Sequence, residues 1–583
     1  MTLPSRQDHH PPRTPPRAPR RMRGGPRFLP AHEAVGLIRP GDTVAIGGSG
    51  GGLLEPDLLL RTLGEAYERG TGPGGLTLVH TTGIGDREGG GMDHLALPGL
   101  ARRVIAGNWG MAPRMSRMVT ENRFEAYNLP QGVMSQLFRE IAGGRPGLVT
   151  HVGLGTFCDP RVEGGRLNDI TTEELVEVVT LAGREWLFYP AFGLDVCLIR
   201  GSVADENGNL SLDEEGATLE TLSVAQATRN SGGLVVAQVK RVAEAGSLPP
   251  RSVAVPGICV DVVVVHPEQR QVVTHDYNPA FSGQFKQALS HLEPFPLDQR
   301  KVVARRAVAE IRDGDVVNLG VGIADGVASV AAEEGWSDRF TLTIEQGIVG
   351  GVPARGVIFG VATNPTAVLD QPYQFDFYDG GGLDIAFLGF AQVDRDGNVN
   401  VSKFGRRVVG TGGFVNISQN ASTVVFCGTF TAGGARSVPG DGRLTIEQEG
   451  THRKFVDEVE QVTFSARQAR LRGQRVLYVT ERAVFALGER GLVLVEVAPG
   501  TDARADVLDL MPGPVEVAEP LPEMAAALFT DAPLGVEWRR DGAGADDPSA
   551  GGVGVGVDAV RGRGAPRDRP GRPGSGELVR EGR

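Results

Sequence analysis

The chain has 583 residues, a net charge of −12, 40% hydrophobic residues and 22% charged residues. This length predicts several domains at about 150 residues each, and the composition is typical of a soluble globular protein. The negative net charge argues against a nucleic-acid partner, which requires a basic face. No apolar run is long enough to cross a membrane, so no membrane partner is predicted.

The cysteines favour a reducing compartment. Four are present, far apart in the sequence and without a C-x-x-C pair: Cys158, Cys197, Cys259 and Cys427. This spacing predicts neither a zinc site nor a disulfide framework, and we expect a cytoplasmic protein with no bound metal.

The two ends of the chain differ in composition from the rest. Residues 1–28 are rich in Arg and Pro, and the prolines oppose the amphipathic helix of a transit peptide. Residues 541–583 mix Gly, Pro, Asp and Arg without periodicity. We therefore predict a disordered extension, a disordered tail, and between them two domains at 29–295 and 296–540.

The first domain opens with alternating helix and strand signals. A short helix is predicted at His32–Ile38 and a strand at Thr43–Ile46, followed by the glycine loop Gly47–Gly52 and a helix from Glu55. Further along, the patterns predict a helix around Glu173–Leu181, a strand at Gly233–Val239 and an apolar segment at Ile258–Val265.

The same order of elements returns in the second domain. A helix is predicted at Lys301–Ile311 and a strand at Val316–Leu319, and Gly320–Gly326 opens another helix. Residues 204–211 and 393–400 also resemble one another as glycine-containing hairpins. These matches predict an α/β fold of two related domains, each an open, mostly parallel sheet covered by helices.

A single carboxylate ends a strand in the second domain. Thr341–Ile344 alternates β-branched and apolar residues and runs into Glu345. Three glycines follow this carboxylate: Gly347, Gly350 and Gly351. The carboxyl ends of strands are where open α/β sheets bind ligands, although a solvated turn would give the same pattern.

Two mechanisms compete for this stretch. The glycines of Gly320–Gly326, with Glu345 about 20 residues further on, approach a dinucleotide fingerprint but are one residue too widely spaced. Alternatively, Glu345 attacks a thioester as a nucleophile and forms first a mixed anhydride and then a glutamyl thioester. The second mechanism needs one carboxylate, oxyanion donors and room for a long thiol.

Several stretches together resemble the family I CoA-transferases over most of residues 29–513. The residues from Glu345 to Pro353 resemble the family's catalytic segment, and the resemblance extends to fused single-chain acetate, propionate and 3-oxoacid CoA-transferases. The other shared stretches are residues 128–132, 150–157, 371–384, 410–419 and 480–485.

The resemblance implies specific roles. Glu345 would carry the anhydride and then the CoA thioester, and Gln131 would donate to the thioester oxyanion. The second donor would be the backbone N–H of Gly412 or Gly413, while Gly347, Gly350 and Gly351 would bind CoA. Gln346 departs from the Asn or Ser of many relatives.

The resemblance also implies the partners. Acyl-CoA and a short-chain carboxylate would be the substrates, with CoA the covalently carried group and no permanent cofactor. The protein would be a homo-oligomer, with a CoA-transferase (NagB-like) fold.

Simpler interpretations stay open for several of these residues. Gln131 is equally well explained as a turn residue, and Gly412–Gly413 as a tight turn. His151 and Cys427 are predicted to be structural, and the aromatic residues Tyr373, Phe375, Phe377 and Tyr378 are predicted to lie in the core.

Alternative functions also remain. The same site would act as an acyl-CoA hydrolase with water as acceptor, and an NAD(P)-dependent oxidoreductase or a non-catalytic ligand sensor are more distant possibilities.

Overall fold

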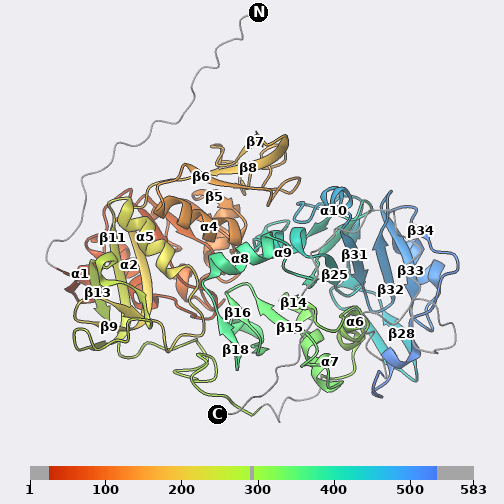
Figure 1. Cartoon of the computed structure of the whole chain (residues 1–583). Helices are drawn as coiled ribbons and strands as arrows, with labels where there is room; N and C mark the ends of the chain where they lie inside the picture. Colours follow the sequence, from red (N-terminus) through yellow and green to blue (C-terminus); the bar gives the residue numbers. More distant parts are fainter. Residues whose placement is uncertain (1–24, 289–294, 535–583) are drawn as a thin grey trace, which may run out of the picture.

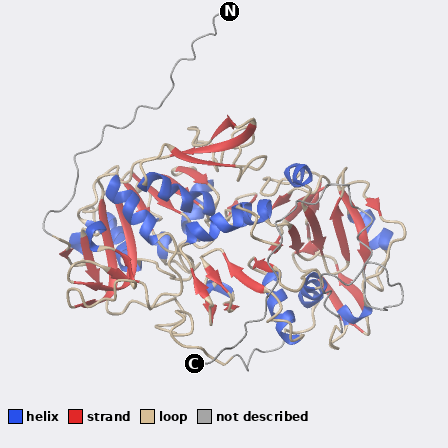
Figure 2. Cartoon of the chain, in the orientation of Figure 1, coloured by secondary structure: helices blue, strands red, loops and turns tan. Residues whose placement is uncertain are grey.

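The computed structural model describes residues 25–288 and 295–534, and these form two α/β halves, each built on a ten-stranded sheet. In Figure 1 the first half runs from red to yellow-green and the second from green to blue. Strands form the middle of each half and helices lie around them (Figure 2). The predicted fold class is confirmed.

All neighbouring strands along the main path of the first sheet are parallel. Their spatial order is β5–β4–β3–β2–β9–β11–β13–β1. Their bounds are β1 Arg27–Phe28, β2 Thr43–Ile46, β3 Leu76–His80, β4 Ala101–Ala106, β5 Glu125–Asn128, β9 Val196–Asp205, β11 Leu234–Ala243 and β13 Val262–Val265. Two short strands, β10 Leu210–Ser211 and β12 Val253–Val255, extend this sheet at β9.

Five helices cover the two faces of this sheet because alternate strand residues are apolar on both sides. On one face Val44 and Leu78 pack against α1, α2 and α3, and on the other Ala45 and Val79 pack against α4 and α5. The helices are α1 Ala31–Val35, α2 Asp57–Glu68, α3 Pro113–Thr120, α4 Gln131–Ala142 and α5 Thr221–Asn230.

The second sheet has a parallel centre and antiparallel edges. Its order is β19–β16–β15–β14–β20–β25–β31–β32–β33–β34. The strands are β14 Val316–Leu319, β15 Thr341–Ile344, β16 Ile348–Val349, β19 Ala367–Val368, β20 Ile385–Gly389, β25 Thr423–Cys427, β31 Arg475–Val479, β32 Ala483–Leu487, β33 Leu492–Val497 and β34 Glu516–Val517. The helices are α6 Gln299–Val308, α7 Gly326–Glu333, α8 Gln371–Asp379, α9 Phe414–Asn420 and α10 Ala466–Arg472.

Smaller sheets decorate both halves. The largest projects at the top of Figure 1 and consists of β6, β7 and β8. The small strands are β6 Gly147–Thr150, β7 Glu177–Leu181, β8 Arg184–Pro190, β17 Val352–Pro353, β18 Ala362–Thr363, β21 Gln392–Asp394, β22 Val399–Asn400, β23 Lys403–Phe404, β24 Arg407–Val408, β26 Thr431–Ala432, β27 Arg436–Gly440, β28 Arg443–Gln448, β29 His452–Arg453 and β30 Phe455–Val456.

The central five strands of the two halves follow one plan. The parallel order β3–β2–β9–β11–β13 in the first half corresponds to β15–β14–β20–β25–β31 in the second. After β9 the chain forms a hairpin with β10, and after β20 it forms the hairpin of β21 and β22. The predicted relationship between the halves therefore has a structural counterpart.

Two sequence predictions need correction. The predicted helix at Glu173–Leu181 is wrong, because Glu177–Leu181 forms strand β7, paired with β8. The β-branched run Val178–Thr180 favours a strand over a helix.

The predicted extension also ends earlier than residue 28. The Arg27 N–H donates to the Asp261 carbonyl (2.9 Å) at the sheet edge, which offers backbone partners whatever the composition of the segment. Residues 1–24 of that extension and the predicted tail at 541–583 lie outside the described residues. The domain division at residue 295/296 stays a prediction.

The two halves meet along an extensive polar and apolar contact. In Figure 1, helices α8 and α9 of the second half lie between the two sheets, next to α4 of the first. The Trp109 N–H donates to the Val409 carbonyl (2.7 Å), and Asn108 forms a β-bridge with Gly410. An apolar cluster that includes Leu53 and Val361 also spans the contact.

Candidate active site

Glu345 occupies the first position of a tight hairpin turn. Strand β15 ends at Ile344 and pairs antiparallel with β16 from Ile348, so only Glu345, Gln346 and Gly347 connect them. Gly347 has φ +103°, and a Cβ atom there would lie 2.0 Å from the Leu369 carbonyl oxygen. The turn therefore requires glycine at position 347. Its geometry holds Glu345 at the carboxyl end of the strand, as the sequence predicts.

The surroundings of Glu345 disfavour its charged form. Burial raises the pKa of Glu345 to about 7, although its own backbone N–H and the Gln346 side chain stabilise the anion. Burial also raises the pKa of the Tyr378 phenol, and the charge of Glu345 adds to that increase. A poorly solvated carboxylate that is about half ionised at pH 7 is suited to nucleophilic attack.

Gln346 links the Glu345 turn to the first half. Its Nε2 lies 3.5 Å from the Ser49 Oγ, in the glycine loop after β2. Gly360 lies against the same side chain. The residue that departs from many relatives therefore contacts both Glu345 and the opposite half.

The predicted oxyanion residues lie beside Glu345. The Gln131 N–H donates to the Gly412 carbonyl (3.1 Å). A Cβ atom on Gly412 would lie 3.3 Å from the Gln131 Oε1, and one on Gly413 would lie 3.3 Å from the Glu345 Cγ. The structure thus brings together Gln131, Glu345, Gly412 and Gly413, which are up to 282 positions apart in the sequence.

The two candidate glycine donors differ in availability. The Gly412 N–H donates to the Gly107 carbonyl (2.8 Å). The Gly413 N–H, at the start of α9, has no acceptor among the described residues. Gly413 is also crowded, since a Cβ there would lie 3.2 Å from the Ile417 Cδ1 and 3.3 Å from the Phe375 Cζ.

Gln131 differs from its predicted setting. It is the first residue of α4 and only 2% exposed, so it lies neither in a turn nor in an open cleft. Its Nε2 donates to the Gln371 Oε1 across the contact between halves (3.1 Å). The resemblance pointed to Gln131, but its buried partners come from distant segments that no local sequence pattern connects.

The backbone conformation and close packing of the fold already require glycine at positions 350 and 351. Both Gly350 and Gly351 have positive φ values, +71° and +78°. A Cβ on Gly350 would lie 2.2 Å from the Thr366 Oγ1, and one on Gly351 would lie 2.6 Å from the Thr363 carbonyl oxygen. Their contacts within the chain explain these glycines, so CoA binding by Gly347, Gly350 and Gly351 stays a prediction.

The residues predicted to be structural divide into two groups. Phe375, Tyr378 and Cys427 are buried, as predicted, whereas Tyr373 and Phe377 are 58% and 45% exposed on the outer side of α8. The His151 Nε2 pairs with the Asn420 Oδ1 (2.7 Å) between the halves.

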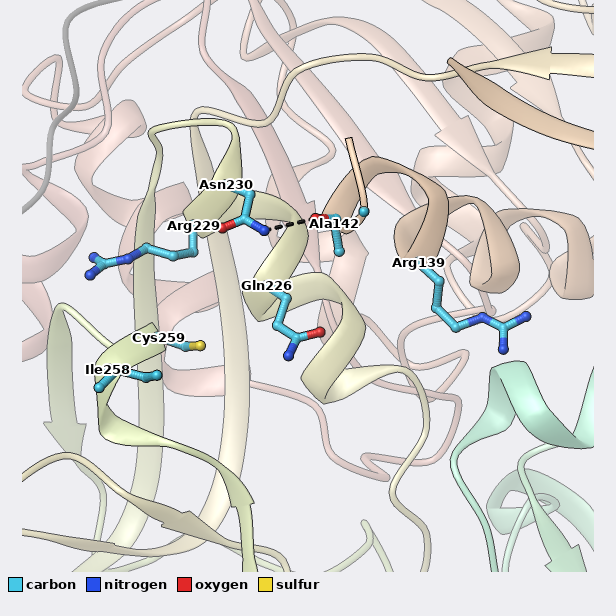
Figure 3. A pocket seen from close by; sticks show the side chains of 8 residues that line it. Arg139, Ala142, Gln226, Arg229, Asn230, Ile258 and Cys259 are labelled. Atoms are coloured by element: carbon cyan, nitrogen blue, oxygen red, sulfur yellow. Dashed lines mark hydrogen bonds between the residues drawn. The ribbon is translucent and has the colours of Figure 1, made fainter. Parts of the chain in front are cut away.

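A pocket lies elsewhere in the first half, away from Glu345. It has a volume of about 730 Å³ and lies beside α4, α5 and residues 257–259. Figure 3 shows the side chains of Arg139 and Arg229 pointing away from one another, with Asn230 bonded to the Ala142 carbonyl. None of the residues around Glu345 lines this pocket.

The described residues contain neither a metal-binding cluster nor a membrane-spanning helix. In residues 25–288 and 295–534, no three His, Cys, Asp or Glu side chains gather in a way that would hold a metal ion. None of the helices in this part of the chain has the length and apolar character needed to cross a membrane.

Known proteins resemble this chain along most of its length. The model of the coenzyme A transferase family matches residues 29–266. The acetate CoA-transferase YdiF of Escherichia coli K12 is 44% identical over 518 residues, covering 89% of this chain and 98% of that protein. The caffeate CoA-transferase of Acetobacterium woodii is also 44% identical, over 87% of this chain and 98% of its own length.

Solved structures agree with these matches. The crystal structure of the acyl-CoA transferase YdiF from Escherichia coli O157:H7, as apoenzyme, has a TM-score of 0.86 and 43% identity, and covers 90% of this chain and 100% of that one. A second structure of that protein, a thioester complex with CoA, covers the same shares with a TM-score of 0.85. These matches over 87–90% of the chain lead to one conclusion: the chain belongs to the coenzyme A transferase family and is a CoA-transferase.

Proposed function

We propose that the enzyme moves CoA from a short-chain acyl-CoA to a free carboxylate, such as acetate or propionate, through a thioester on Glu345. The position of Glu345 supports this proposal most strongly. Its carboxylate stands at the tip of a strand, poorly solvated, and next to Gly413, whose backbone N–H has no acceptor among the described residues; the buried amide of Gln131 lies against the neighbouring Gly412. These are the parts that acyl transfer through a carboxylate nucleophile needs.

The reaction has two balanced halves. The Glu345 carboxylate adds to the thioester carbonyl, and the CoA thiolate leaves to give a mixed anhydride. The thiolate then adds to the glutamyl carbonyl of that anhydride and expels the donor acid as its carboxylate. The acceptor carboxylate reverses these steps and departs as its CoA thioester, with Glu345 restored.

The oxyanion of each step needs donors that are already in place. We assign the backbone donor to Gly413, because the Gly412 N–H is occupied by the Gly107 carbonyl. The Gln131 Nε2 gives one N–H to Gln371 and has a second N–H for the substrate oxygen. Donors fixed before the charge develops favour the transition state over the bound substrate.

Substrate range, oligomeric state and location belong to the same proposal. The names of the relatives pair CoA transfer with acetate in one protein and with caffeate in another. A thioester complex with CoA is known for a relative, which supports a covalent CoA intermediate here. Acyl-CoA and a short-chain acid are the proposed substrates, CoA is the carried group, and a cytoplasmic homo-oligomer is the expected form.

Mass spectrometry tests this proposal. The enzyme is incubated with acetyl-CoA, treated with borohydride or hydroxylamine and digested. We expect a modified peptide at Glu345 only after incubation with acetyl-CoA, and none in Glu345→Gln. A modification at another residue, or no modification, would reject the proposed mechanism, and release of free CoA without an acceptor acid would favour the hydrolase.

A further inference from the structure

Three helices from different parts of the chain begin close together at one buried point, and Gln131 is the first residue of one of them. Helix α4 begins at Gln131, α8 begins at Gln371, and Glu220 immediately precedes α5. These three side chains are at most 2% exposed. The first and third helices belong to the first half and α8 to the second, so the point lies on the contact between halves.

A chain of hydrogen bonds connects these residues. The Gln131 Nε2 donates to the Gln371 Oε1 (3.1 Å). The Gln371 Nε2 in turn donates to the Glu220 Oε2 (2.9 Å) and the Ser135 Oγ (3.2 Å). The Thr81 Oγ1 donates to the other carboxylate oxygen of Glu220 (2.8 Å).

The carboxylate gives this chain its direction. When Glu220 is ionised, its carboxylate only accepts hydrogen bonds, so Gln371 turns its amide nitrogen toward Glu220 and its amide oxygen toward Gln131. Gln131 must then turn its own nitrogen toward Gln371. One of the two N–H bonds of the Gln131 side chain is therefore used for Gln371. Because the amide is planar, this hydrogen bond also sets the direction of the second N–H bond.

We infer that Glu220 is a positioning residue for CoA transfer, acting through Gln371 to hold the Gln131 amide in the orientation that serves the oxyanion. This inference rests on the proposed role of Gln131 in the reaction. All three side chains are buried, so an amide that turned away would lose a hydrogen bond without forming another with water. Burial therefore restricts the orientation of these hydrogen bonds.

The environment of Glu220 is consistent with a functional role. Burial raises the pKa of Glu220 to about 7; the Thr81 hydroxyl and the backbone N–H of Glu220 lower it, and the nearby Asp370 carboxylate raises it. A buried carboxylate without a cationic partner is costly to keep. No Lys, Arg or His forms an ion pair with Glu220 among the described residues, so the Thr81 hydroxyl, the Gln371 amide and the backbone N–H of Glu220 itself stabilise the carboxylate.

A double-mutant cycle with Gln131 tests the inference. Glu220→Met removes the acceptor at similar volume, and we expect kcat to fall by about 10–100-fold with the KM for acetyl-CoA changed by less than about threefold. In the Gln131→Ala background the same substitution should change kcat by less than about threefold, because the amide it orients is already absent. Equal losses of kcat in both backgrounds would overturn the inference.

The conservative variant supplies a second readout. In Glu220→Gln the amide oxygen still accepts from Gln371 while the nitrogen donates to the Thr81 hydroxyl, so the direction of the chain survives. We expect this variant to keep kcat within about threefold of wild type. A loss of kcat as large as that of Glu220→Met would show that the direction of these hydrogen bonds does not matter for catalysis.

Asp379 provides the matched control. It is a partly buried carboxylate between the halves, and it accepts hydrogen bonds from the Gln136 Nε2 (3.0 Å) and the Asn416 Nδ2 (3.0 Å) but forms no hydrogen bond with Gln131. Asp379→Leu should destabilise the fold similarly, yet any change in kcat should be the same with and without Gln131. Coupling of Asp379 to Gln131 as strong as that of Glu220 would contradict the specific role of Glu220.

Two further outcomes are separable. If Glu220→Met folds too poorly for kinetics, Gln371→Met breaks the same chain one residue closer to Gln131 and is judged by the same comparison. If wild-type enzyme forms no adduct at Glu345, the proposed mechanism itself fails. If it forms the adduct but the kcat losses are additive, only the positioning role of Glu220 fails.

Discussion

The two halves share a strand, a glycine loop, a helix and a second parallel strand, but they differ at the residue that follows. In the first half β3 ends at His80 and runs into Thr81, and the chain goes on to a further parallel strand, β4. In the second half β15 ends at Ile344 and runs into Glu345, and the chain turns back at once as β16. The tight turn presents a carboxylate where the first half presents a hydroxyl.

This difference teaches how one plan produced two roles. Thr81 faces inward and donates to Glu220, so the first half uses the position for support. Glu345 is held beside Gly413, and in the proposed mechanism the second half uses it for chemistry. In the same proposal the first half contributes Gln131, from the helix that follows β5.

The largest effect on kcat should come from substituting Glu345, and the corresponding residue of the first half, Thr81, serves as the comparison. Glu345→Gln removes the nucleophile at nearly constant shape, and kcat should fall by at least about 10⁴-fold. Thr81→Val, at the corresponding position of the first half, removes one hydrogen bond and should lower kcat by no more than about tenfold. Steady-state transfer from acetyl-CoA to propionate measures both. Comparable losses in the two variants would erase the distinction between the halves.

The contribution of the first half can be measured at Gln131. Gln131→Ala removes a donor whose hydrogen bond strengthens as the oxyanion forms, so kcat should fall by about 10²–10³-fold while the KM for acyl-CoA changes little. Because Gln131 is buried and bonded to Gln371, a lower melting temperature is expected as well. A rate within a few-fold of wild type would confine the first half to structural support.

The rate of adduct formation should depend on pH, because Glu345 titrates near pH 7 whereas the Thr81 hydroxyl at the corresponding position does not titrate. With a pKa of about 7, about 1% of Glu345 is ionised at pH 5, so adduct formation at that pH should be about 100-fold slower than above pH 8. Stopped-flow measurement of adduct formation checks this. A rate that is independent of pH between 5 and 8 would contradict the buried carboxylate.

The same pKa shift has a signature in stability. The folded state holds the Glu345 proton more tightly than the unfolded chain, whose pKa is near 4.5, so stability falls as pH rises from about 4.5 to about 7. Glu345→Gln removes this loss. Its melting temperature should therefore exceed that of wild type above pH 7, and the difference should vanish below about pH 4.5. A difference that grows on acidification would have the wrong sign.

Local sequence patterns predict the strand that precedes Glu345 and two other short strands correctly. The bounds of β2, β14 and β15 were predicted correctly, because short β-branched runs that end at glycine or at a charge are unambiguous. The helix predicted at 173–181 is wrong for 177–181, where the β-branched run Val178–Thr180 favours the observed strand and pairs with β8.

The remainder of the site depends on long-range contacts. Gln131 was found only through the family resemblance, and nothing local marks Glu220 or Thr81 as its support. These residues come together because Gln371, 240 positions from Gln131, starts a helix against the other half. A contact of that kind is a property of the folded chain and has no signature in a window of sequence.

The central claim is that Glu345 carries CoA between donor and acceptor, and a preloaded enzyme tests it most directly. The enzyme is mixed with acetyl-CoA, freed of unbound nucleotide and rapidly mixed with propionate. We expect one equivalent of propionyl-CoA per loaded site, formed at a rate no slower than kcat, with the loss of the Glu345 adduct following the same time course. Release of free CoA in place of propionyl-CoA, or an adduct that turns over more slowly than kcat, would contradict the account.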